Sequence, residues 1–229
     1  MNQETVRSRI REVGIIPAIR VSSADDAIFA AQTVSEAGIP IVEVTMTVPG
    51  ALEVIQELVR SHPNLIVGAG TVCDVETARH CLKAGAHFLT GTGLDLDIVN
   101  LAIAEKVVTL PGVLTPTEVM AACKAGCDFV KVFPCTQMGG PQYIRVLRNP
   151  FPHVPMIASG GVTQQNAMEF ILAGADAIGI GNDLVPHRAI ERRETDWIRE
   201  LVRRFTTLVK DARARLATLA PEGPAAVVR

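Results

Sequence analysis

The chain has little net charge and no long apolar run. Its 229 residues contain 22 Lys and Arg against 24 Asp and Glu, so the formal net charge is only −2. That balance gives no basic surface field for nucleic acid and no polyacidic tail. No stretch approaches the ~20 apolar residues that a membrane span needs. We therefore expect neither nucleic acid nor a membrane as a partner, and local groups would have to bind any anionic substrate.

Sequence patterns for disulfides and metals are missing as well. An odd number of cysteines gives no disulfide framework and favours a reducing, cytoplasmic location. The five are Cys73, Cys81, Cys123, Cys127 and Cys135. The spacing of Cys123 and Cys127 is not a zinc spacing, and the five histidines form no paired ligand motif. We expect no metal and no cofactor.

One of the five lysines has unusual neighbours. Lys131 lies in the run FVKVFP, with branched and aromatic residues on both sides, whereas the other lysines have small, polar or charged neighbours. Burial disfavours a charged ammonium, and a neutral amine is a nucleophile that typically forms a Schiff base with a carbonyl substrate. The alternative is a strand-end lysine whose amine extends to water. Lys131 is thus a candidate nucleophile.

An internal repeat indicates the fold. An Ala-Gly pair that would end a helix precedes a strand-like run four times, with glycines at 38, 85, 126 and 174, at intervals of 47, 41 and 48 residues. Each interval suits two βα units. The missing strands are the apolar runs 14–20, 65–70, 107–111 and 155–159. Eight apolar strands that alternate with helices favour an α/β fold, a (β/α)8 TIM barrel, over an open doubly wound sheet.

The expected helices give one domain over residues 1–217. They cover 23–37, 49–61, 74–84, 96–105, 115–125, 139–148, 163–173 and about 195–217. Residues 218–229 contain two prolines and a glycine and are predicted to form a flexible tail.

Reactive groups in such a barrel lie at the carboxyl ends of the strands. Glu43 interrupts the run IVEV and is a candidate general base, or else an ion-pair partner of Arg20 or Lys131. Arg20 and Thr71 end their strands and could bind a carboxylate, although Arg20 could equally be a solvated strand end.

The last two strands are followed by glycines. Gly160-Gly161 and Gly181 precede helices, and exposed N–H groups at such positions bind phosphate in barrels of this kind. The alternative is that these glycines only permit tight turns.

The motifs IPAIR, VEVT, GAGTV, FVKVFP, GGPQYI, IASGGV and GIGNDLV occur in order along nearly the whole barrel. This set resembles the 2-keto-3-deoxy-6-phosphogluconate (KDPG) and 4-hydroxy-2-oxoglutarate (KHG) aldolase family, the class I pyruvate aldolases. The resemblance implies a homotrimer of barrels, each with an extra N-terminal helix at residues 3–13. It also implies a Schiff-base lysine at Lys131, a proton carrier at Glu43 and a pyruvate contact at Thr71. Gly160 and Gly161 would bind the phosphate.

The chain departs from the family pattern at three places. Thr47 stands where many members have an arginine that binds the pyruvate carboxylate, and Arg20 is the candidate replacement. Gly91-Thr92 replaces a Ser-Pro or Thr-Pro pair, and Asn182 replaces a serine that contacts phosphate. Phe133 and Ser159 complete the predicted substrate-binding set, which is Arg20, Thr47, Thr71, Phe133, Ser159, Gly160, Gly161, Gly181 and Asn182.

The function that follows from the resemblance is a lyase that cleaves KDPG to pyruvate and glyceraldehyde 3-phosphate. The same residues could cleave 4-hydroxy-2-oxoglutarate or the galactonate epimer of KDPG. A phosphosugar isomerase or epimerase, and a non-catalytic barrel that binds sugar phosphates, are the alternatives outside aldol chemistry.

Overall fold

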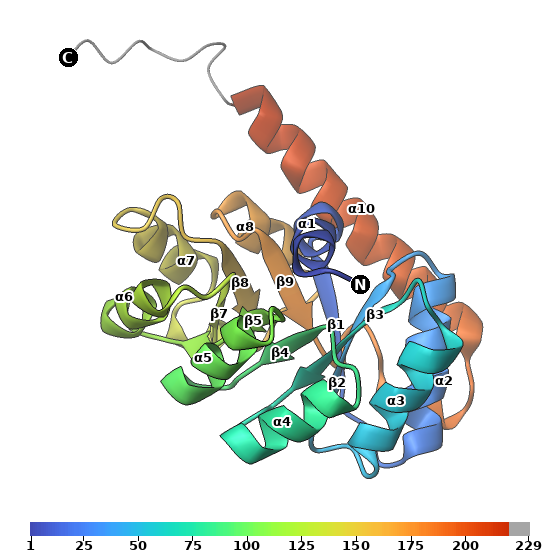
Figure 1. Ribbon diagram of the computed structural model, residues 1–229. Helices are drawn as coiled ribbons and strands as arrows, with labels where there is room; N and C mark the ends of the chain where they lie inside the picture. Colours follow the sequence, from blue (N-terminus) through green and yellow to red (C-terminus); the bar gives the residue numbers. More distant parts are fainter. Residues whose placement is uncertain (220–229) are drawn as a thin grey trace, which may run out of the picture.

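A computed structural model describes residues 1–219 and consists of a parallel barrel surrounded by helices (Figure 1). The strands are β1 (Ile15–Ile19), β2 (Ile41–Thr45), β3 (Ile66–Gly70), β4 (Phe88–Thr90), β5 (Val108–Leu110), β6 (Gly112–Val113), β7 (Val130–Val132), β8 (Met156–Ser159) and β9 (Ala177–Ile180). The helices are α1 (Gln3–Val13), α2 (Ala24–Glu36), α3 (Ala51–Ser61), α4 (Val75–Lys83), α5 (Leu96–Ala104), α6 (Pro116–Ala125), the 3-10 helix η1 (Thr136–Met138), α7 (Pro141–Arg148), α8 (Ala167–Leu172), α9 (His187–Glu191) and α10 (Thr195–Leu219). The predicted (β/α)8 barrel with an N-terminal helix is confirmed.

The ring of strands closes at Pro111. The sheet order runs β5-β4-β3-β2-β1-β9-β8-β7-β6, and its two ends are separated in the chain by Pro111 alone. Proline has no N–H to donate to a ladder, but the carbonyl of Pro111 accepts a hydrogen bond from the backbone N–H of Lys131 at 2.9 Å. Within residues 1–219, the nine strands therefore occupy eight barrel positions.

Helix α1 covers the amino ends of the strands. Val6 and Ile10 are buried against the barrel, and Arg7 forms an ion pair with Asp128, just before β7, at 3.1 Å. Asp128 also accepts a hydrogen bond from the backbone N–H of Thr109 at 3.0 Å. This end is therefore closed, and a substrate would have to enter at the carboxyl ends.

Local sequence signals determine where the helices begin and end. Thr115 and Glu118 form a capping box at the start of α6, and Gly126 ends that helix in the left-handed conformation, with φ of 90°. The first helix ends in the same way at Gly14, with φ of 70°, where a Cβ would lie only 2.4 Å from the Arg213 guanidinium. That guanidinium donates to the carbonyls of Arg11 and Asp176. Arg213 of α10 thus connects the end of α1 to the residue that precedes β9.

Some details differ from the sequence expectation. The expected strand 107–111 is observed as β5, but a second short strand, β6, follows its proline, and the short elements η1 and α9 were not predicted. Helix α10 runs to Leu219, past the predicted end at 217, and the remainder of the predicted tail lies outside the described residues. Within residues 1–219, no helix has both the length and the apolar character needed to cross a membrane.

Candidate active site

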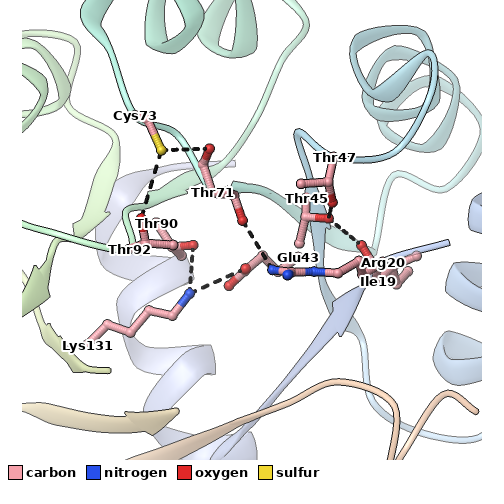
Figure 2. A network of polar contacts seen from close by, with 10 residues as sticks. All are labelled: Ile19, Arg20, Glu43, Thr45, Thr47, Thr71, Cys73, Thr90, Thr92 and Lys131. Carbon is pink, nitrogen blue, oxygen red and sulfur yellow. Dashed lines mark hydrogen bonds and ion pairs between the residues drawn. The ribbon is translucent and has the colours of Figure 1, made fainter. Parts of the chain in front are cut away.

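Lys131, Glu43 and Thr90 meet inside the barrel, from strands β7, β2 and β4 (Figure 2). The Nζ atom of Lys131 lies 3.5 Å from Oε1 of Glu43 and 3.3 Å from Oγ1 of Thr90. The Lys131 and Glu43 side chains are only 9% and 5% exposed. Removing one partner of a buried pair leaves an uncompensated charge and costs about 3–5 kcal/mol. An amine beside a carboxylate has the parts for attack on a carbonyl and for proton transfer there.

Strand alternation explains why these side chains point inward. Successive side chains of a strand face opposite sides, so Val130 and Val132 face the helices while Lys131 faces the interior. Glu43 lies between Val42 and Val44 in the same way.

The space for the Glu43 carboxylate comes from a glycine on the neighbouring strand. A Cβ built at Gly70 would lie 2.1 Å from Oε1 of Glu43, which no real contact allows. Gly70 ends β3, which pairs with β2. The position of the carboxylate therefore depends on the absence of a side chain at this residue.

Arg20 and Thr71 lie side by side at the ends of β1 and β3. The Nη2 atom of Arg20 donates to Oγ1 of Thr71 at 3.4 Å (Figure 2). Thr71 has φ of 59°, a left-handed conformation that is a genuine outlier for a β-branched residue. Such strain costs about 1–3 kcal/mol and clusters at functional sites. Thr71 is therefore held in place by its surroundings rather than by its own preference.

Thr47 is not part of this group. It is exposed, and its hydroxyl contacts the Thr45 hydroxyl at 2.7 Å. Thr45 in turn donates to the carbonyl of Ile19 at 3.0 Å. Thr47 thus stabilises the loop after β2 and does not line the cavity described next.

A cavity of about 270 Å³ opens at the carboxyl ends of the strands. Nine of the predicted site residues line it, namely Arg20, Glu43, Lys131, Phe133, Ser159, Gly160, Gly161, Gly181 and Asn182. Thr71 is absent from the lining and joins the site through Arg20 and, through the Cys73 thiol, Thr92. The cavity lining also includes Thr92, which the sequence marked only as a departure from the family pattern, and His187, which it did not single out.

The loops after β8 and β9 form the other side of the cavity. Gly160 and Gly161 have φ of 90° and 81°, and a Cβ at Gly161 would lie 2.6 Å from Thr136. Within residues 1–219, the backbone N–H groups of Gly161, Val162 and Asn182 have no hydrogen-bond acceptor. Unpaired N–H groups that line a cavity are suited to an anion.

The Asn182 side chain has a defined orientation. Its Oδ1 atom accepts a hydrogen bond from the backbone N–H of His187 at 3.1 Å, at the start of α9. The amide NH₂ therefore remains as the donor. Next to it, desolvation raises the pKa of the Asp183 carboxyl above its ordinary value. Within the described part of the chain, no group of three or more His, Cys, Asp or Glu side chains is placed to hold a metal ion.

The family model for KDPG and KHG aldolases matches residues 6–201. The chain belongs to this family. A 2-dehydro-3-deoxy-phosphogluconate aldolase of Pseudomonas aeruginosa is 30% identical to this aldolase over 214 residues, which cover 90% of the chain and 96% of the relative. The enzyme is therefore a lyase, and the isomerase and non-catalytic alternatives are set aside.

Two solved structures extend the comparison. KDPG aldolase from Legionella pneumophila, with pyruvate captured as a covalent carbinolamine, gives a TM-score of 0.80 at 27% identity, over 86% of this chain and 95% of that one. KDPG aldolase of Zymomonas mobilis with 3-phosphoglycerate gives 0.76 at 27% identity, over 99% and 100% of the two chains.

The dependence of Glu43 on Gly70 can be tested by adding one methyl group. Gly70→Ala should displace the Glu43 carboxylate and lower kcat at least tenfold, since acid–base groups typically contribute ~10²–10⁴-fold. Gly93→Ala is the matched control, because a Cβ there has nothing within 4 Å. Steady-state kinetics and thermal unfolding of both variants provide the measurement. An unchanged kcat in folded Gly70→Ala would show that the carboxylate position is unimportant.

Proposed function

We propose that this aldolase cleaves KDPG to pyruvate and glyceraldehyde 3-phosphate through a Schiff base on Lys131. The single observation that carries the proposal is the buried amine beside one carboxylate, in a cavity whose far side presents free N–H groups. The Legionella relative, which is described with a covalent pyruvate carbinolamine, supports the same chemistry here.

Imine formation begins with attack of the Lys131 amine on the C2 ketone. Glu43, 3.5 Å from the amine, carries protons between nitrogen and the former carbonyl oxygen, which leaves as water. Burial of both groups excludes bulk water that would compete for these protons.

Bond cleavage follows from the protonated imine. Glu43, directly or through a water, removes the proton of the C4 hydroxyl, the C3–C4 bond breaks, and the imine nitrogen accepts the electron pair as an enamine. The aldehyde leaves, C3 is protonated, and hydrolysis releases pyruvate and free Lys131.

The two ends of the substrate require different groups. Arg20 binds the pyruvate carboxylate in place of the arginine that Thr47 replaces, and Thr71 holds the Arg20 guanidinium. Gly160, Gly161, Gly181 and Asn182 bind the distal phosphate, with Phe133 and Ser159 between the two ends. Substrates that share the pyruvate portion, KHG and the galactonate epimer of KDPG, are the alternative candidates.

We also propose that the protein is a cytoplasmic homotrimer. The five cysteines, all within the described residues, are free thiols, in keeping with a reducing compartment. Exposed apolar side chains on α5 and α6, among them Leu96 and Met120 at 44% and 63%, are surface that association could bury.

Borohydride trapping with pyruvate tests the Schiff base. Wild-type enzyme should become irreversibly modified on Lys131, as located by mass spectrometry of peptides. Lys131→Ala should lose both the adduct and retro-aldol activity, while Lys83→Ala, a change at an exposed lysine, should keep both. An adduct on another lysine would contradict the assignment.

The role of Arg20 predicts a defect in pyruvate binding. A hydrogen bond to a charged group contributes ~1.5–3 kcal/mol, so Arg20→Ala should weaken pyruvate binding by roughly ten- to a hundredfold. Arg20→Lys keeps the charge but not the planar guanidinium, so its affinity for pyruvate should lie between those of the wild type and Arg20→Ala. The pyruvate concentration that half-saturates borohydride trapping measures this binding in each variant. A wild-type value in Arg20→Ala would assign the carboxylate to other groups.

The phosphate loops predict a preference for the phosphorylated substrate. The kcat/KM for KDPG should exceed that for the same acid without phosphate at least tenfold, or about 1.4 kcal/mol. Asn182→Ala should reduce this ratio without abolishing it, because the backbone donors remain. Equal values for the two acids, with KHG cleaved as fast, would mean that these loops are only tight turns.

A further inference from the structure

We propose that Thr90 is a catalytic residue of this aldolase, whose hydroxyl retains one N–H of Lys131 and so directs the reacting lone pair of the nitrogen into the cavity. The proposal rests on the proposed Schiff base at Lys131. It assigns a role to a strand residue that lies beneath the cavity and does not line it.

Thr90 is placed to act on the amine and on little else. It ends β4 and is 1% exposed, and its Oγ1 atom lies 3.3 Å from Nζ of Lys131, closer than Oε1 of Glu43 at 3.5 Å. Within residues 1–219, Lys131 is the only hydrogen-bond partner of this hydroxyl. Figure 2 places the Thr90 and Glu43 oxygens on different sides of the nitrogen.

The two acceptors together fix the orientation of the amine. A neutral amine nitrogen is tetrahedral, with Cε, two hydrogens and one lone pair. When Thr90 and Glu43 each accept one N–H, the lone pair takes the remaining direction. Lys131 and Glu43 line the cavity whereas Thr90 is buried behind them, so this direction is the open one. Without Thr90 the amine could rotate about the Cε–Nζ bond and turn its lone pair away from the ketone.

The proton balance of imine formation gives the same residue a second task. An ammonium has three N–H bonds, and the protonated imine has one. Two protons therefore leave with the ketone oxygen as water, and Glu43 carries them. The third must stay on nitrogen. A threonine hydroxyl accepts a hydrogen bond but does not take up the proton, so the N–H that faces Thr90 is the one retained. Glu43 is then free to move protons on the substrate.

Substitutions that keep the shape of residue 90 separate this role from packing. Thr90→Val removes the hydroxyl at similar volume, and Thr90→Ser keeps it. Thr109→Val is the matched control. Thr109 is also 1% exposed, lies on the adjacent strand β5, and is in register with Leu89 rather than Thr90, so it faces the helices.

The readout is borohydride trapping at increasing pyruvate concentration, with wild-type enzyme in parallel. Thr90→Val should lower the limiting rate roughly ten- to a hundredfold, with little change in the half-saturating concentration. Thr90→Ser should recover to within about threefold of wild type. Thr109→Val should match wild type. Thr90→Ala serves in the same comparison if Thr90→Val does not fold.

Each other outcome overturns the proposal in a recognisable way. If Thr90→Val traps pyruvate at the wild-type rate, the hydroxyl does not act on the amine. If Thr90→Ser is as slow as Thr90→Val, or if Thr109→Val is equally slow, the effect is packing. If wild-type enzyme itself is not trapped on Lys131, the Schiff-base function fails, and that result is distinct from a failure of Thr90.

Discussion

A charged pair inside an apolar barrel is the constraint on which the site depends. Lys131 and Glu43 lie among strands whose other residues are almost all apolar, and each is costly to bury without the other. Their contact also requires a small neighbour, since Gly70 leaves the space for the carboxylate. The barrel thus gives up a side chain at Gly70 in order to hold these two charged groups together.

Strain and unpaired donors gather at the same end of the barrel. Thr71 adopts a left-handed backbone conformation, and the glycine pair after β8 leaves N–H groups that have no acceptor in the described part of the chain. Both features oppose stability, and both lie where a substrate would be bound. The other end is closed by α1 and its Arg7–Asp128 ion pair, so stability and chemistry are divided between the two ends.

Much of this arrangement could be predicted from the sequence, because its strongest signals are local. A charge in an apolar strand identified Lys131 and Glu43, and repeated Ala-Gly pairs indicated the barrel. Thr90 carried no such signal, because threonine is ordinary in a strand, and its inward direction follows only from the pairing of β4 with β5. His187 joins the cavity through the Asn182 contact at α9, which no periodicity reveals. Thr47 follows β2 in the sequence, but the structure turns its hydroxyl toward Thr45 and not into the cavity, which the sequence alone does not reveal.

The position of Pro111, between the two ends of the sheet, has a consequence for how the contacts of Lys131 form. It divides the chain into a first part that supplies Arg20, Glu43 and Thr90, and a second that supplies Lys131 and the glycine loops. Every contact of the Lys131 amine with its two partners crosses between these parts. In a half-assembled barrel Lys131 would lack both Glu43 and Thr90, so the proposed nucleophile requires both parts to have docked. We therefore expect activity only from the complete barrel.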